Sequence, residues 1–126
     1  MWQETRVAPR YNTRLICRIL PANIDSTNKL PRQTIGYTRD ISASGIAAVV
    51  STIGPEKQYL TSRDSPLLVE IDFASGSIAM ETTYVRMERL TRTHYHQDEG
   101  YLVCFSIRTM TKAARGRFEE YLAAMG

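Results

Sequence analysis

The sequence contains no long hydrophobic run. Its longest apolar stretches, residues 46–50 and 67–69, are far shorter than the roughly 20 residues that a helix needs to cross a bilayer. The N-terminal segment MWQETRVAPR is polar and has none of the apolar core of a secretory signal. We therefore expect a cytoplasmic protein that does not insert into membranes.

Cysteine is also scarce, since Cys17 and Cys104 are the two that the sequence contains. Each lies within an apolar, strand-like run, and no Cys-x-x-Cys spacing occurs. This pattern favours two small, buried, reduced side chains in a reducing compartment over a disulfide or a metal pair.

Lysine is much rarer than arginine, which supplies thirteen of the sixteen basic residues. Arginine is preferred where a planar, bidentate donor must recognise a phosphate or a base edge. The positive charge is concentrated in residues 1–40, which hold seven basic and three acidic residues, whereas the rest of the chain is close to neutral. This distribution favours an anionic partner, but a net charge of +3 is too small to indicate bulk DNA or RNA binding.

The chain is expected to form a single domain, because 126 residues with 43% apolar content can bury one core. The polar residues 1–13, which include Pro9, are expected to form a flexible N-terminal arm. Residues 14–109 form the strand-rich body, and residues 110–126 a C-terminal helix. Strands are expected at residues 14–20, 33–40, 45–50, 66–73, 77–90 and 100–107.

The tail differs from this body because its apolar residues follow a helical period. One helical stripe holds Ala114, Phe118, Tyr121, Leu122 and Met125. Thr111 is the expected N-cap. Successive short strands with turn signals between them favour a small barrel or sandwich, against which this helix would bury its apolar stripe.

Two short motifs carry most of the functional information. Arg10-x-x-x-Arg14 stands just before the first expected strand, and Asp40-x-Ser42-x-x-Gly45 joins the second to the third. Each is a weak signal alone, because spaced arginines are common on solvated loops and the second motif also describes an ordinary capped turn. Their order, and the run of strands and the helix that follow, make the combination more specific.

In this combination the chain resembles the PilZ domain family, whose members typically receive the bacterial messenger cyclic di-GMP. The resemblance covers about residues 6–124 and includes IGYTRDISASGIAAVV, the strand GYLVCFSI and the closing helix. It implies an all-β fold with one C-terminal helix, in the form of a small antiparallel six-stranded β-barrel. It also implies a receptor that is not an enzyme and needs no cofactor or metal. By this resemblance the ligand is bound by Arg10, Arg14, Asp40, Ser42 and Gly45.

The chemistry of these residue types suits a guanine dinucleotide. An arginine fork matches the O6 and N7 acceptors of guanine and also matches a phosphate. An ionised Asp40 accepts hydrogen bonds, and the guanine N1 and N2 donate them. Ser42 can donate its hydroxyl, and Gly45 allows close approach. Adenine lacks the O6 acceptor and the N2 donor, so such a site should reject it by roughly 1–3 kcal/mol per bidentate contact.

Further ligand contacts are harder to assign from the sequence. Arg6, Arg39 and Arg86 are additional candidates, together with Tyr37. The arm that carries Arg10 is expected to become ordered on ligand binding and to offer a new surface to an unknown effector protein. The domain itself is expected to be a monomer or a weak dimer.

Other interpretations of the chain remain open. The leading alternative is a PilZ-type adaptor that binds no nucleotide, in which both arginines are surface charges. His94-x-His96, with Asp98 and Glu99 nearby, could present metal ligands for an enzyme, although a solvated hairpin connection explains the same residues. A small basic barrel could also bind single-stranded nucleic acid, but the tyrosines form no evident stacking platform.

Overall fold

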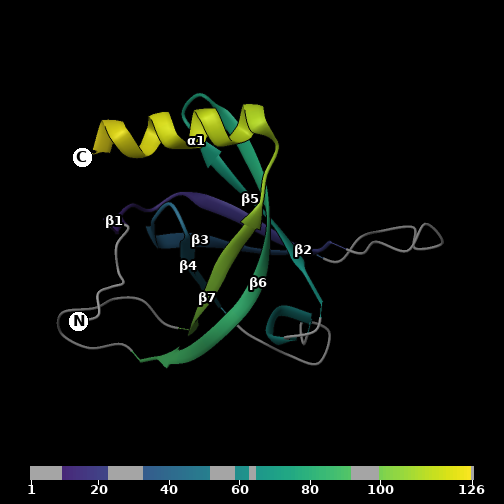
Figure 1. Cartoon of the computed structure of the whole chain (residues 1–126). Helices are drawn as coiled ribbons and strands as arrows, with labels where there is room; N and C mark the ends of the chain where they lie inside the picture. Colours follow the sequence, from purple (N-terminus) through teal and green to yellow (C-terminus); the bar gives the residue numbers. More distant parts are fainter. Residues whose placement is uncertain (1–9, 23–32, 52–58, 63–64, 92–99, 126) are drawn as a thin grey trace, which may run out of the picture.

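The computed structural model describes residues 10–22, 33–51, 59–62, 65–91 and 100–125 (Figure 1). The elements within these residues are seven strands and one helix. They are β1 (Tyr11–Asn12), β2 (Ile16–Pro21), β3 (Thr34–Ile41), β4 (Gly45–Val50), β5 (Leu67–Phe73), β6 (Gly76–Leu90), β7 (Gly100–Thr109) and α1 (Lys112–Met125).

The strands form one closed antiparallel barrel. Their order is β1-β3-β2-β5-β6-β7-β4, and a further pairing of β3 with β4 closes the sheet. This confirms the expected six-stranded barrel with one C-terminal helix. The additional strand β1 pairs with β3 through Tyr11 opposite Ile41 and Asn12 opposite Asp40. Residues 11 and 12 were expected in the flexible arm, so in the structure the sheet extends into that segment.

The core fills the barrel with alternating side chains. On β5 every second residue from Leu67 to Phe73 is buried, which is the period-two pattern of a strand with one face in the core. The β5–β6 hairpin turns immediately before Gly76, whose φ of +130° lies in the region that favours glycine. The sequence signal for this turn, Ser75-Gly76, is therefore confirmed.

Helix α1 lies across one end of the barrel (Figure 1). It begins where predicted, because the Thr111 Oγ1 accepts a hydrogen bond from the Ala114 backbone N–H at 3.1 Å. Ala114, Phe118 and Leu122 are buried, and Phe118 packs against Phe73 with ring centroids 6.2 Å apart. Burying a side chain such as Phe118 contributes about 1.5–3 kcal/mol, so the helix is held mainly by this apolar stripe. Within the described residues, no helix is both long and apolar enough to span a membrane.

Candidate functional site

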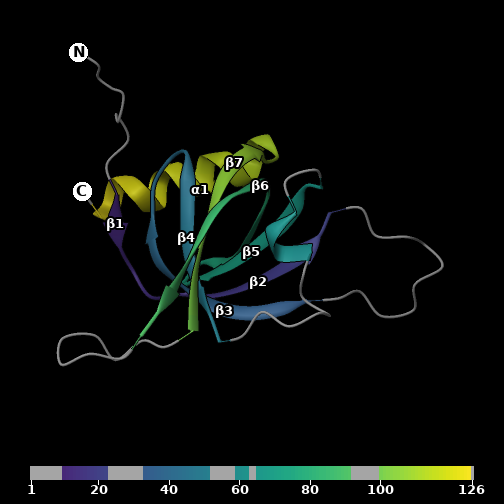
Figure 2. The same cartoon turned by 90° about the horizontal axis from the view of Figure 1, so that it is seen from below.

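The segment that carries both arginines of the first motif runs along one edge of β3. Strands β1 and β2 both pair with this edge, and residues 13–15 form the break between them. Figure 2 shows the purple chain curving from β1 at one side of the barrel to β2, which runs alongside β3. Arg10 therefore precedes β1, and Arg14 lies in the break.

The break is fastened to β3 by the buried Thr38. Its hydroxyl donates to the carbonyl of Thr13 and accepts from the N–H of Leu15 at 2.9 Å. The backbone adds two hydrogen bonds, from Thr13 N to the Arg39 carbonyl and from Thr38 N to the Leu15 carbonyl. Thr38 is fully buried, so these bonds fix the path of the chain between Arg10 and Arg14.

Arg10 and Asp40 lie together on this edge. The Arg10 Nη1 is 3.9 Å from the Asp40 Oδ1, and the two side chains are 70% and 27% exposed. Asp40 is placed by pairing on both sides, with Asn12 of β1 and with Ala47 of β4. The structure thus brings the first arginine of one motif to the carboxylate of the other. At this distance and exposure the ion pair is weak, and both groups remain accessible to a ligand.

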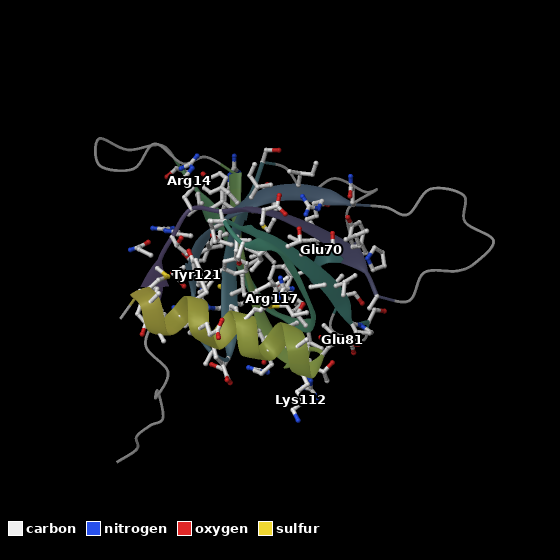
Figure 3. The ribbon with its side chains drawn as sticks, turned by 90° about the horizontal axis from the view of Figure 1, so that it is seen from above. Arg14, Glu70, Glu81, Lys112, Arg117 and Tyr121 are labelled. Atoms are coloured by element: carbon white, nitrogen blue, oxygen red, sulfur yellow. The ribbon has the colours of Figure 1, made fainter. Side chains whose placement is uncertain are left out.

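Arg14 stacks on an aromatic ring of the same strand. Its guanidinium carbon lies 3.8 Å from the ring centroid of Tyr37 on β3, a cation–π contact. The contact restricts the orientation of an exposed arginine and presents the plane of its guanidinium. Figure 3 shows Arg14 on the side of the barrel away from Lys112 of the helix.

The β3–β4 turn has a geometry set by Ser42 and Gly45. The Ser42 Oγ accepts from Gly45 N at 3.1 Å and from Ser44 N at 3.3 Å, and the side chain is buried. A Cβ on Gly45 would lie 3.0 Å from the Phe105 carbonyl oxygen of β7, so a side chain here would crowd the neighbouring strand. In the structure both residues therefore shape the turn that follows Asp40.

A row of directly opposed residues crosses four strands on the outer face of the barrel. Asp40 of β3 faces Ala47 of β4, Ala47 faces Cys104 of β7, and Cys104 faces Arg86 of β6. Irregularities in the pairing next to Asp40 and next to Arg86 help to set this register. The small side chains of Ala47 and Cys104 thus separate a carboxylate from a guanidinium.

The next row on the same face is apolar in its centre. Tyr37 faces Val49, Val49 faces Leu102, and Leu102 faces Glu88. Ala47, Val49 and Leu102 form a small hydrophobic cluster outside the main core, against which Tyr37, Leu90 and Cys104 pack. Packing within this cluster fixes the relative positions of the strands that carry the charged groups. We call the two rows, with Arg10 and Arg14 beside them, the outer surface.

The charges of the outer surface act on one another. Burial raises the pKa of the Cys104 thiol and is the largest effect; Arg86 and Arg10 oppose it, whereas Asp40 and Glu88 add to it. The pKa of Arg86 is raised mainly by its hydrogen bond to Glu88, and Asp40 contributes as well. Asp40 at one end of the first row and Arg86 at the other thus act on each other electrostatically.

Several sequence predictions can now be located. The structure brings Arg10 to Asp40 and Arg14 to Tyr37 along β3. Arg86 lies at the other end of the row that begins at Asp40, and Arg39 lies at the irregularity in the β3–β4 pairing. Arg6, the His94-x-His96 pair, Asp98 and Glu99 lie outside the described residues. Within the described ranges, no group of three or more potential metal ligands occurs.

Both cysteines are free thiols, but they differ in burial. Cys17 is fully buried as expected, and burial raises its pKa to about 11. Cys104 is only half-buried and belongs to the outer surface, which corrects the expectation that it is buried. Sequence reasoning also missed Glu88, because its position depends on strand register, for which the sequence offers no signal.

No protein-family model matches the chain. No curated protein sequence matches it either. Solved structures do match its fold. The PilZ domain of YcgR from Escherichia coli with c-di-GMP has a TM-score of 0.68 at 11% identity, covering 97% of this chain and 92% of that one.

Two further structures share the fold over part of their length. The K. pneumonia MrkH–c-di-GMP complex has a TM-score of 0.69 at 18% identity, covering 97% of this chain and 52% of MrkH. The Bacillus subtilis inhibitor of motility, MotI/DgrA, has a TM-score of 0.65 at 16% identity, covering 94% of this chain and 50% of that one. The chain thus spans about half the length of these two proteins, and its fold is PilZ-like.

Proposed function

We propose that this domain is a cyclic di-GMP receptor, which orders its N-terminal arm around the ligand and signals through contact with an effector protein. The observation that carries the proposal is the meeting of the two motifs, with Arg10 3.9 Å from Asp40 on the edge of β3. The PilZ-like fold supports it, since YcgR and MrkH carry c-di-GMP in structures of the same fold.

The roles follow from the chemistry of each group. Arg10 and Arg14 would bind the guanine Hoogsteen edge or a phosphate, because a guanidinium fork fits both. Asp40 would accept the N1 and N2 donors of guanine. Ser42 and Gly45 would act chiefly through the shape of the turn, since the Ser42 hydroxyl is already engaged there. Arg39 and Arg6 are secondary candidates.

Binding is tested by titrating cyclic di-GMP into the purified domain by calorimetry. We expect saturable binding, with cyclic di-AMP weaker by at least about tenfold because adenine lacks two of the recognised groups. Arg10→Ala and Arg14→Ala should each remove most of the binding, whereas Arg6→Ala should matter less. Unchanged affinity in Arg14→Ala would refute the site. If the wild type does not bind, the proposal is wrong and the alternative, an adaptor that binds no nucleotide, is favoured.

Ordering of the arm needs a separate measurement. Amide hydrogen exchange of residues 5–13 is compared with and without ligand, and we expect slower exchange in the complex. Strand β5, which carries none of the proposed ligand-binding residues, serves as the internal reference. Equal protection of residues 5–13 in both states would rule out the switch.

A further inference from the structure

On the outer surface, two arginines are already paired with carboxylates of the protein. Arg10 lies beside Asp40, and Arg86 donates a hydrogen bond to Glu88. Each of these carboxylates therefore occupies a guanidinium that an anionic ligand would also seek. Asp40 has a use in the proposed complex as the acceptor for guanine donors, whereas Glu88 neutralises Arg86 and would repel a phosphate that approaches this guanidinium.

Strand register places Arg86 at the end of the surface opposite Arg10. Three strand spacings separate the backbones of Asp40 and Arg86, about 14 Å at the usual spacing between neighbouring strands. Cys104, which is directly opposite Arg86, feels the charges of both Arg86 and Arg10. The intervening Ala47 and Cys104 are small, so no bulky side chain of that row separates the two ends.

We propose that Arg86 is a ligand-binding residue of the outer surface and that Glu88 restrains it, so that an anionic dinucleotide binds only by displacing this carboxylate from the guanidinium. Glu88 is thereby a residue that sets affinity for the ligand. The inference rests on the proposed function, because it concerns the same ligand. It goes further in assigning the opposite end of the surface and in naming a group that opposes binding.

The pair is suited to such an exchange. Both side chains are 51% exposed, so the ion pair is screened by water and is cheap to break. They project from β6 two residues apart, on the same face of the strand. A phosphate or a guanine edge can therefore replace Glu88 with little movement of the Arg86 backbone.

The test is a double-mutant cycle read by calorimetric titration with cyclic di-GMP. We expect Arg86→Gln to weaken binding about tenfold, the loss of one bidentate contact. Glu88→Gln should tighten it about two- to fivefold, in keeping with the strength of an exposed ion pair. In the Arg86→Gln background, Glu88→Gln should give no gain, because its effect acts through Arg86.

Two matched controls separate this effect from a change in net charge. Arg89→Gln removes an arginine from the opposite face of the same strand, and Glu120→Gln removes an exposed carboxylate from α1. Both should leave affinity unchanged. A gain from Glu88→Gln that persists without Arg86 would show simple repulsion and would overturn the restraint.

The remaining outcomes are also decisive. If the wild type binds and Arg86→Gln binds equally well, the assignment of Arg86 is wrong and the proposed function stands. If the wild type does not bind at all, the proposed function fails and the inference fails with it. Alkylation of Cys104 gives an independent readout, since bound ligand over this row should slow it, while the buried Cys17 stays unreactive.

Discussion

Two outer faces of the barrel carry arginines next to carboxylates, and they use them differently. On the face of β2 and β5, the Arg18 Nη2 lies 2.6 Å from Asp72 Oδ1 and its Nε lies 3.2 Å from Glu70 Oε1. The Arg18 side chain is 25% exposed, whereas that of Arg10 on the outer surface is 70% exposed and lies 3.9 Å from Asp40. Arg18, which binds two carboxylates closely, therefore stabilises the fold, whereas Arg10, which is held weakly, is available to a ligand.

The difference also appears in how the carboxylates are held. Asp72 accepts from both terminal nitrogens of Arg18 and from Ser77 Oγ at 2.8 Å, and these hydrogen bonds hold its pKa below the usual value. Asp40 touches Arg10 without a hydrogen bond of normal length. An incoming ligand therefore has little to break at Asp40, whereas at Asp72 it would have to replace a bidentate pair.

Removing the arginines of each face should have opposite consequences. Arg10→Gln with Arg14→Gln should weaken cyclic di-GMP binding by at least about 100-fold, with little change in unfolding free energy, because two recognition forks are lost. Arg18→Gln should leave affinity unchanged and reduce unfolding free energy by about 1 kcal/mol or less. Calorimetric titration and urea unfolding of both variants measure this. Loss of binding in Arg18→Gln alone would abolish the distinction between the faces.

The attachment of the arginine segment can be tested through a buried threonine. Thr38→Val removes the hydroxyl that bonds Thr13 and Leu15, so we expect a loss of about 1–3 kcal/mol in unfolding free energy and weaker ligand binding. Urea denaturation and calorimetry report the two effects.

The matched control is Thr82→Val. Thr82 is equally buried, but its hydroxyl donates to the Leu67 carbonyl at 3.1 Å, away from the site. This variant should lose stability and keep its affinity for the ligand. Equal affinity in both variants would mean that Thr38 does not position the segment.

The sequence predicted the elements well because their physical signals are local. Alternation marked β5, the glycine turn marked the β5–β6 hairpin, and Thr111 marked the start of α1. The sequence did not predict β1, because two residues are too few to show a period and the pairing of Tyr11 with Ile41 spans 30 positions. Its existence depends on the edge that β3 offers, which is a tertiary property.

The candidate site divides in the same way. Arg10, Arg14 and Asp40 were found because their spacing is fixed along the chain. The row from Asp40 to Arg86 depends on strand register and on pairing irregularities that the sequence pattern does not predict. For Ser42 the sequence allowed two roles, a cap of its own turn or a ligand contact. Its hydrogen bonds to the backbone of Ser44 and Gly45 favour the role in the turn. Local motifs thus locate a site, and topology determines which other residues join it.

The smallest expected effect concerns acid stability on the face of β2 and β5. Because folding lowers the pKa of Asp72, its ionised form is favoured in the native state, and the resulting stability is complete above the unfolded value, near 3.8. That stability is lost as the pH falls through the lower native pKa. Asp72→Asn should therefore flatten the acid limb of unfolding free energy against pH, measured by urea denaturation between about pH 7 and pH 2.5. Arg18→Gln should flatten it in part, because the Ser77 hydroxyl also lowers this pKa, and the double variant should be no flatter than Asp72→Asn, because Arg18 acts through the Asp72 carboxyl. A limb in Arg18→Gln as steep as in the wild type would show that Asp72 gains its low pKa from a source other than Arg18, and the face would then be held together less tightly than its geometry indicates.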